Sequence, residues 1–297
     1  MLEMSDYGIG NTPLKELDSI NGNHIFVKLE QVNYLGSIKA RTGYWITKNL
    51  PKEAENKTVI ESTSGNLGFA LGFFCKEIGR KFLCLVDPSI AVSKLKRLED
   101  ARIEYEIVEK KPELDFRSSR IKRAEELMAS GEYYWVNQYD NPFGIMAHQR
   151  TTAPEIWEQT NGKVTHVICP MGSCGTICGI SLFMKERSKQ IKICGVEPYG
   201  STIFGEADAP YINVGAGLMG KPGNLLSSHA IVDVADTVND LTSIRYCQEL
   251  HHKYRLAVGV TSGMAYAEAL QIAATERNAF IVFIAPDGRE SYSEYLK

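Results

Sequence analysis

The sequence predicts an α/β protein in which doubly wound, mainly parallel sheets are covered by helices. Short runs of β-branched and other apolar residues alternate with amphipathic stretches of roughly 12 to 16 residues, which is the pattern of parallel strands joined by crossover helices. The last run, residues 280–285, is apolar throughout, as a strand must be when helices cover both faces of its sheet. With 44% apolar and 23% charged residues, the composition is that of an ordinary globular protein.

The strands are predicted, in chain order, from runs rich in Val, Ile and aromatic residues. Residues that favour turns, or the polar start of an amphipathic stretch, bound each run. Helices fill the intervals, for example residues 69–78 after the second strand. The candidate strands cover residues 24–30, 57–63, 81–87, 102–109, 133–138, 165–171, 192–198, 231–236 and 279–286.

The length of 297 residues fits one large domain or two domains of about 100 to 200 residues each. No linker rich in Pro or Ser divides the chain, and the best candidate boundary lies near Asn141 and Pro142, after the fifth strand. Thirty-three Lys and Arg residues oppose 36 Asp and Glu residues, a formal net charge of -3. The basic surface of a nucleic-acid-binding protein is therefore not expected.

The cysteines and the N-terminal sequence indicate the cellular compartment to expect. Seven Cys residues stand mostly in apolar runs without a Cys-x-x-Cys pair, so we expect reduced thiols in the core. The N-terminus lacks a basic segment followed by an apolar one, and no apolar run approaches the ~20 residues that cross a bilayer. These features lead us to expect a cytoplasmic protein that binds no membrane.

Three loops carry residues suited to chemistry, and the first contains Lys39. Ser37 is expected to cap a helix whose first turn holds Lys39. The positive end of the helix dipole lowers the pKa of an amine in that turn towards the nucleophilic free amine. Such a lysine can form a Schiff base. The alternative is a solvated surface lysine with Arg41 beside it.

The second and third loops each join a predicted strand to a predicted helix and are suited to anions. Residues 61–68 combine Ser, Thr and Gly, whose hydroxyl and free backbone N–H groups suit a carboxylate or a phosphate. In residues 172–179, glycines let the backbone wrap a phosphate, with Ser173 and Thr176 as hydroxyl donors. The alternative for each loop is a plain helix cap or turn. Cys174 and Cys178 lie one turn apart without a further Cys or His, so no metal site is expected.

These loops, in this order, resemble the cysteine synthase and cystathionine β-synthase family of pyridoxal-phosphate enzymes, known as fold type II. The resemblance implies two α/β domains with the active site between them. Residues 1–34 and 145–297 would form the larger domain, which binds the cofactor's phosphate, and residues 35–144 the smaller one. The matching motifs cover residues 10–14, 28–30, 33–41, 63–66, 135–139, 151–157, 172–176, 195–198 and 261–263.

The resemblance also implies a role for each site residue. Lys39 would be the catalytic lysine that holds pyridoxal 5′-phosphate as a Schiff base, and Asn66 would hydrogen-bond the cofactor's 3′-oxygen. Thr63, Ser64 and Gln138 would bind the substrate's α-carboxylate. The cofactor's phosphate would lie in the turn formed by Gly172, Ser173, Cys174, Gly175 and Thr176.

Several residues depart from the usual family pattern. Cys174 stands in the phosphate turn where glycine is usual, and Leu67 replaces a Thr that helps to hold the carboxylate. Gly288 occupies the position of a Ser that faces the pyridine nitrogen. Whether Asp287, Ser262 or no residue replaces that Ser is open.

Residues 63–68, 135–139 and 203–205 look more like a sub-branch of the family, the O-phosphoserine-using synthases of 2,3-diaminopropionate formation. In that branch an Arg on the helix after the fourth strand is thought to receive the phosphate leaving group, and Arg120 matches it. A guanidinium fits a phosphate dianion bidentately. The alternative is a solvated charge on the helix surface.

The resemblance implies a homodimeric enzyme that acts on small amino-acid substrates. The expected reaction is β-replacement on an activated L-serine, O-acetyl or O-phospho, with sulfide or an amino-acid amine as nucleophile. Two alternatives remain open: elimination or hydration that releases sulfide from cysteine, and a non-catalytic protein that binds pyridoxal phosphate and docks a partner. Residues 215–218 are a candidate closing element, because exclusion of water decides between replacement and elimination.

Overall fold

Two β-sheets of unequal size organise the chain. The computed structural model describes residues 3–296 except 64, 206–207, 214 and 293–294. The larger sheet has the strand order β1-β2-β10-β7-β8-β9 and the smaller one β5-β4-β3-β6, with every pair parallel except β1 with β2. The strands are β1 Leu14–Glu16, β2 His24–Leu29, β3 Thr58–Ser62, β4 Phe82–Val86, β5 Glu104–Ile107, β6 Tyr133–Trp135, β7 His166–Pro170, β8 Lys192–Pro198, β9 Val234–Val238 and β10 Phe280–Ala285.

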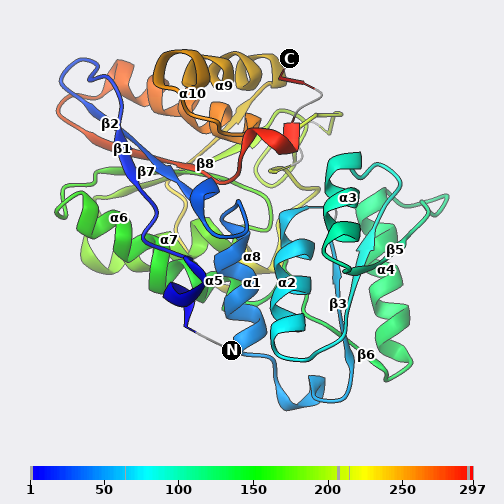
Figure 1. Ribbon diagram of the computed structural model, residues 1–297. Coiled ribbons are helices and arrows are strands. Elements are labelled where there is room, and N and C mark those ends of the chain that lie inside the picture. Colours follow the sequence, from blue (N-terminus) through cyan, green and yellow to red (C-terminus); the bar gives the residue numbers. More distant parts are fainter. Residues whose placement is uncertain (1–2, 64, 206–207, 214, 293–294, 297) are drawn as a thin grey trace.

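Helices connect the parallel strands and cover both sheets, which form two lobes side by side (Figure 1). The π-helical turn His148–Thr152 joins two of them. The α-helices are α1 Lys39–Lys48, α2 Asn66–Glu77, α3 Val92–Asp100, α4 Phe116–Ala129, α5 Pro142–Ala147, α6 Ala153–Gln159, α7 Gly175–Arg187, α8 Gly223–Ser227, α9 Asp240–Tyr254 and α10 Val260–Thr275.

All nine predicted strands are present, and the α/β prediction is confirmed. The predicted strand 231–236 is displaced and begins at Val234. Just before it, the Asp233 carboxylate accepts the backbone N–H of Ile193 at 2.7 Å, and the Asp233 backbone N–H donates to Ile193 O at 2.8 Å. One strand, β1, was not predicted. It has only three residues and pairs with the edge strand β2 through an antiparallel ladder.

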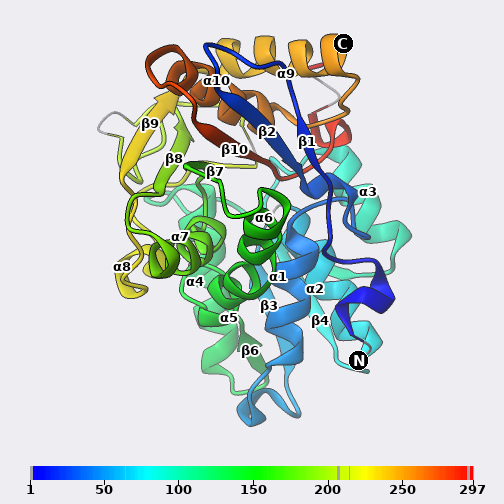
Figure 2. The ribbon, with the colours of Figure 1, turned by 90° about the vertical axis from the view of Figure 1, so that its left-hand side faces the viewer.

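Strand β10 is apolar on both faces because helices cover both sides of the larger sheet. Ile281 and Phe283 pack into a core with α10, whereas Val282 and Ile284 pack into a second core with α7. Successive side chains of a strand point to opposite faces, so a central strand covered on both sides needs apolar residues at every position. Figure 2 shows α9 and α10 on one side of the larger sheet and α6 and α7 on the other.

The smaller sheet is covered in the same way, by α2 on one face and α4 on the other (Figure 1). The adjacent helices α1 and α2 come unusually close at Gly43. A Cβ on this residue would lie 2.7 Å from the Cβ of Ala70, so a larger side chain would push the helices apart. The close packing holds the start of α1 against that of α2.

A buried ion network anchors α1 to the larger lobe. The Arg41 guanidinium donates to both Glu30 oxygens at 2.7 and 2.8 Å and to both Glu155 oxygens at 2.6 and 2.8 Å. Lys28 also donates to Glu155, at 2.6 Å. Two cations thus balance two carboxylates inside the protein, and Arg41 is fully buried. The alternative in which Lys39 and Arg41 lie together on a solvated surface is therefore wrong for Arg41.

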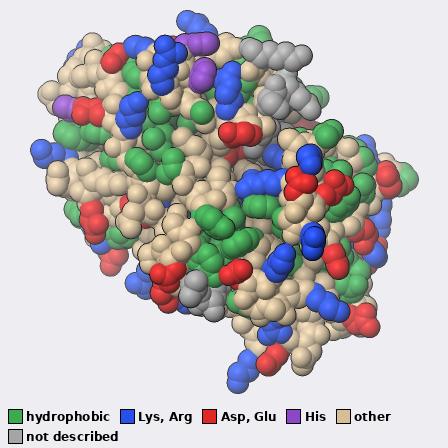
Figure 3. Space-filling view, viewed as in Figure 1, with side chains coloured by type: hydrophobic (Ala, Val, Ile, Leu, Met, Phe, Trp, Pro, Cys, Tyr) green, Lys and Arg blue, Asp and Glu red, His purple; other side chains and the backbone are tan. Residues whose placement is uncertain are grey.

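Acidic and basic side chains are interspersed on the face shown in Figure 3. This mixture agrees with the formal net charge of -3. Among the described residues, no helix combines the length and the apolar character needed to cross a membrane.

Candidate active site

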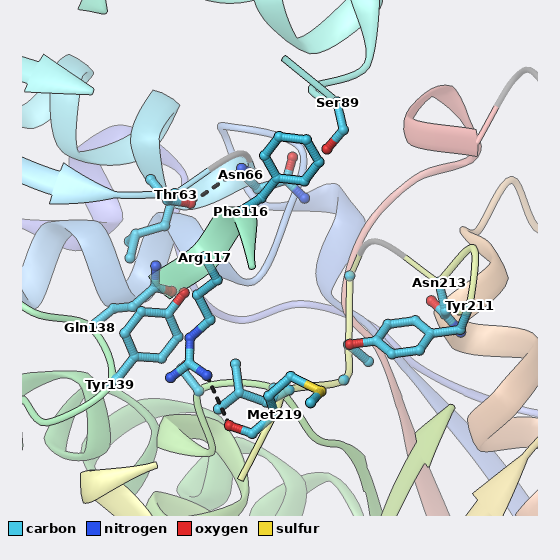
Figure 4. A pocket seen from close by; sticks show the side chains of 18 of the residues that line it. Thr63, Asn66, Ser89, Phe116, Arg117, Gln138, Tyr139, Tyr211, Asn213 and Met219 are labelled. Carbon is cyan, nitrogen blue, oxygen red and sulfur yellow. Dashed lines mark hydrogen bonds between the residues drawn. The ribbon is translucent and has the colours of Figure 1, made fainter. Parts of the chain in front are cut away.

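A cavity of about 830 Å³ opens between the two lobes. Residues within three positions of the strand ends of both sheets line it: Thr63 after β3, Gln138 after β6, Gly172 after β7 and Pro286 after β10. The carboxyl ends of parallel strands are where open α/β sheets bind ligands. Figure 4 shows Thr63, Asn66 and Gln138 on one side of the cavity and Tyr211 on the other.

Lys39 is the first residue of α1 and lines this cavity. The Ser37 hydroxyl accepts the Lys39 backbone N–H at 3.3 Å, although Ile38 is the residue at the N-cap position. The backbone N–H of Ile38 donates to Pro286 O at 2.8 Å, which ties the start of α1 to the end of β10. Desolvation is the first cause that lowers the pKa of Lys39, against the raising influence of acidic groups that include Glu61 and Asp287. The pKa of Lys39 is thus lowered, as the sequence predicted, but burial rather than the helix dipole is the leading cause.

The residues predicted to hold a carboxylate lie near one another at the ends of β3 and β6. Thr63 is buried, and its hydroxyl accepts the Gly65 N–H at 3.2 Å. Gln138 is 9% exposed, and its amide donates to Ser62 O at 3.1 Å. Both side chains line the cavity. Ser64, the third predicted member, lies outside the described residues.

Asn66, the first residue of α2, connects this loop to the end of β10. Its amide donates to Asp287 Oδ2 at 3.1 Å, and both side chains line the cavity. The other oxygen, Asp287 Oδ1, and the hydroxyl of Ser262 are buried without a hydrogen-bond partner in the described chain. Burial raises the pKa of Asp287 to about 6. Asp287 and Ser262, the two candidates to face the cofactor's pyridine nitrogen, therefore each have a polar atom without a partner in the described chain.

The predicted phosphate turn precedes α7, and Gly172 and Ser173 line the cavity. No backbone N–H group of residues 172–177 donates to another residue in the described part of the chain. Unpaired N–H groups at the start of a 13-residue helix are suited to an anion, since the helix dipole adds positive potential there. The turn therefore fits the phosphate of a cofactor.

Cys174 and Gly175 give this turn its shape. Cys174 adopts a left-handed conformation with φ of 61°, and its thiol points back to Gly172 O at 3.4 Å. Burial raises the pKa of that thiol, so it remains protonated. A Cβ at Gly175 would lie 3.2 Å from Gly144 O, so glycine permits the close approach of α5 and α7. Thr176, the last predicted member, is 3.3 Å from His148 Nε2.

Arg120 lines the cavity but is not a free cation. Its Nη1 forms a buried salt bridge with Asp87, and its Nε is buried without a partner. Asp87 follows β4, so the pair joins α4 to the small sheet. The Arg120 charge is already balanced before any ligand enters, and the alternative of a solvated helix charge is wrong.

Arg117, one turn earlier on α4, spans the mouth of the cavity. Its guanidinium lies 4.3 Å from the centre of the Tyr139 ring and donates to Met219 O at 3.0 Å (Figure 4). Met219 follows residues 215–218, which line the opposite wall. Arg117 thereby connects the small lobe to the segment predicted to close the site.

The sequence did not identify Arg117, Lys94 or Glu61 as site residues. Arg117 and Lys94 line the cavity, and Glu61 lies buried beneath Gln138. Their positions relative to the three loops depend on contacts between distant parts of the chain. Arg117 stands in the charged stretch 109–123, whose composition is also typical of a solvated loop and helix, so the stretch gives no specific signal for a site residue. No group of three or more His, Cys, Asp or Glu in the described ranges is arranged to hold a metal ion.

Comparison with known proteins gives a consistent assignment. The family described as "Pyridoxal-phosphate dependent enzyme" matches residues 6–287. Cysteine synthase B of Escherichia coli (strain K12) is 32% identical over 291 residues, covering 96% of this chain and 92% of that protein.

Two solved structures have nearly the same fold. The O-acetylserine dependent cystathionine beta-synthase from Helicobacter pylori superposes with a TM-score of 0.90 at 28% identity, covering 99% of this chain and 98% of that one. A hydrogen sulfide-producing enzyme from Fusobacterium nucleatum superposes with a TM-score of 0.87 at 27% identity, covering 98% of both chains. The match over almost the whole chain, together with the cavity, confirms the predicted resemblance: the chain belongs to the family of pyridoxal-phosphate dependent enzymes, with the fold of the cysteine synthase type.

Proposed function

We propose that this protein catalyses β-replacement on an activated L-serine. The observation that carries the proposal is the cavity between the lobes, around which Lys39, the residues Thr63 and Gln138 and the open turn 172–176 are assembled. The names of the relatives, a cysteine synthase and an O-acetylserine dependent synthase, support the same reaction class.

The residues present fit pyridoxal 5′-phosphate. Lys39 would hold the aldehyde carbon, the unpaired N–H groups of residues 172–177 would hold the phosphate, and Asn66 would hydrogen-bond the ring oxygen. When bound, the cofactor supplies an electron sink that makes the substrate's α-hydrogen acidic. Asp287 and Ser262 offer unpaired oxygens for the remaining polar atom of the ring.

The chain's own groups supply binding, proton transfer and protection from water. Thr63 and Gln138 orient the amino acid through its carboxylate. Lys39 Nζ, whose pKa is lowered by burial, is available as a free amine to remove the α-proton. Arg117 and residues 215–218 close the mouth and exclude water, so that the incoming nucleophile takes the place of the leaving group.

We propose acetate rather than phosphate as the preferred leaving group. The salt bridge to Asp87 already neutralises Arg120, the residue predicted to receive a phosphate. A phosphate dianion arriving there would have to compete with a buried carboxylate. The role of Arg120 as a phosphate acceptor, and membership of the O-phosphoserine-using branch, remain predictions that the comparison of substrates tests.

The sulfide-producing relative from Fusobacterium nucleatum favours a second candidate function. In this alternative, cysteine loses its thiol as sulfide, and water converts the remaining three-carbon unit to pyruvate and ammonia. The same residues would bind the substrate and move the proton, and the outcome would differ only in how much water reaches the site.

We further propose the domain assignment, oligomeric state and compartment implied by the resemblance. Residues 35–144 would form the smaller domain, since they contain every strand of the four-stranded sheet, and residues 1–34 and 145–297 the larger one. All seven cysteines are free and buried, which suits the reducing cytoplasm. Light scattering on the purified protein would test the homodimer, because a monomer and a dimer differ twofold in mass.

The direct test of the function supplies each donor with each nucleophile and identifies the products by mass spectrometry. The donors are O-acetylserine, O-phosphoserine and cysteine, and the nucleophiles are sulfide and glutamate. We expect O-acetylserine with sulfide to give cysteine and acetate faster than O-phosphoserine with sulfide gives cysteine and phosphate. The Lys39→Ala variant should give no product from either donor. Pyruvate from every donor with no replacement product would favour the second candidate instead.

A further inference from the structure

Glu61 is a buried carboxylate directly beneath the residues proposed to bind the substrate's carboxylate. It lies in β3, one residue before the strand ends, and none of its surface is exposed. Its Oε2 accepts the backbone N–H of Gln138 at 3.0 Å. Its Oε1 lies 3.4 Å from Trp135 Nε1 and 3.5 Å from Gln138 Nε2.

These contacts bring Glu61 into competition with the substrate. One N–H of the Gln138 amide is occupied by Ser62 O at 3.1 Å, which leaves the second for either Glu61 or the cavity. An ionised Glu61 would attract that N–H and repel a substrate carboxylate nearby. A neutral Glu61 would attract that N–H less strongly and would not repel the carboxylate, so its protonation state would affect how well Gln138 binds the substrate.

The surroundings do not stabilise a negative charge on Glu61 with a salt bridge. No Lys, Arg or His in the described residues donates to it. The titratable groups within electrostatic reach are Lys39 of α1, Cys84 of β4 and Tyr139 after β6. Arg120 of α4 acts on Cys84 and Tyr139 but is already paired with Asp87.

We propose that Glu61 is a positioning residue that takes up a proton from solvent when a substrate carboxylate binds beside it. The proposal rests on the proposed function and makes the affinity for the substrate depend on pH. Burial raises the pKa of Glu61 to about 7, so the side chain is neutral below that pH and ionised above it. Binding of a carboxylate should therefore be strong at acidic pH and weaken as the pH rises through 7.

The test measures the KM of O-acetyl-L-serine between pH 5.5 and 9 in the holoenzyme. For one titrating proton, the KM of the wild type should rise about fivefold from pH 7 to pH 8. Glu61→Gln should keep the low KM across the range, because its neutral amide has a similar shape. Glu61→Ala should raise KM at every pH with a smaller effect on kcat, since Gln138 loses its support.

Glu268→Gln is the matched control. Glu268 is another buried carboxylate whose pKa is raised to about 7, but it lies in α10 and does not line the cavity. Its variant should retain the wild-type pH profile. A Glu61→Gln enzyme whose KM still rises through pH 7 as in the wild type would overturn the proposal.

A binding measurement without turnover separates this inference from the proposed function. L-Alanine has the carboxylate and amine of a substrate but no leaving group, and ethylamine has the amine alone. Calorimetry in buffers of different ionisation enthalpy should give up to one more proton taken up per L-alanine by the wild type than by Glu61→Gln at pH 7.5, and no such difference for ethylamine. Equal proton uptake by both proteins would contradict the role of Glu61, even if β-replacement occurs. A difference without β-replacement would uphold the role and refute only the function.

Discussion

Gln138 is proposed to bind the substrate's carboxylate and takes no part in the proposed proton transfer, so its loss tests carboxylate binding separately from the rest of the chemistry. A hydrogen bond to a charged group contributes about 1.5–3 kcal/mol, so Gln138→Ala should raise the KM of every amino-acid substrate roughly ten- to hundredfold. Steady-state kinetics with O-acetylserine and cysteine would measure the effect. Gln271 is an exposed glutamine on α10, and Gln271→Ala should leave the KM of both substrates unchanged. A loss confined to one substrate would exclude Gln138 from the carboxylate site.

The residues that could be predicted from the sequence are those fixed by their immediate neighbours in the chain. Lys39 and Asn66 begin helices, and Gly172 lies in the turn before one; turn and cap chemistry is local. Arg117 and Glu61 could not be identified because their partners, Met219 and Gln138, lie 102 and 77 positions away. Only the folded chain brings those pairs together.

Helix α1 depends on Arg41 for its attachment to the larger lobe. Arg41→Ala would leave Glu30 buried without its partner, and breaking a buried ion pair in this way costs about 3–5 kcal/mol. Urea denaturation of the variant and the wild type would measure the loss in the free energy of unfolding. The control is Arg123→Ala on α4, whose partly exposed pair with Glu106 should contribute about 0–1 kcal/mol. Similar losses for both variants would refute the anchoring role.

The contact between α4 and residues 215–219 is expected to control the fate of the substrate. Arg117→Ala removes the bond to Met219 O and opens the mouth, so water should reach the site more easily and the share of pyruvate among the products should rise several-fold. Product analysis with O-acetylserine and sulfide would measure that share. Arg123→Ala is the control and should leave the share of pyruvate unchanged. If Arg117→Ala also leaves that share unchanged, another element excludes water from the site.

Most elements could be predicted because their apolar patterns are long and regular. β10 was found from a continuous apolar run, and its neighbours β2 and β7 from runs rich in Val, Ile and other apolar residues. β1 was missed because three residues, one half-buried and two exposed, carry no periodicity. Its pairing partner across the β1–β2 turn, not its own sequence, makes it a strand.

The two lobes and the cavity between them make cofactor binding a property of the whole molecule. A ligand that binds only the folded protein stabilises it by about 2.7 kcal/mol at a hundredfold excess over Kd. Adding pyridoxal 5′-phosphate to cofactor-free protein should therefore raise its Tm, and Lys39→Ala should reduce the rise. Thermal unfolding of both proteins would measure it. The same Tm with and without cofactor in the wild type would contradict binding between the lobes.

For the molecule as a whole, the sequence predicted the fold class but not the shape of the site. Alternation of strands and helices indicates parallel sheets, and the topology then places loops at their carboxyl ends. The arrangement of the lobes, the salt bridge of Arg120 with Asp87 and the contact of Arg117 with Met219 follow from the packing of side chains that are far apart in the sequence. No local pattern contains that information.

The proposed chemistry depends on a covalent bond between Lys39 and the cofactor. Reducing the protein with borohydride in the presence of pyridoxal 5′-phosphate and mapping the modified lysine by mass spectrometry would test for this bond. We expect modification of Lys39 and its loss in Lys39→Ala. Modification at Lys94, a second lysine that lines the same cavity, with Lys39 unmodified would contradict it.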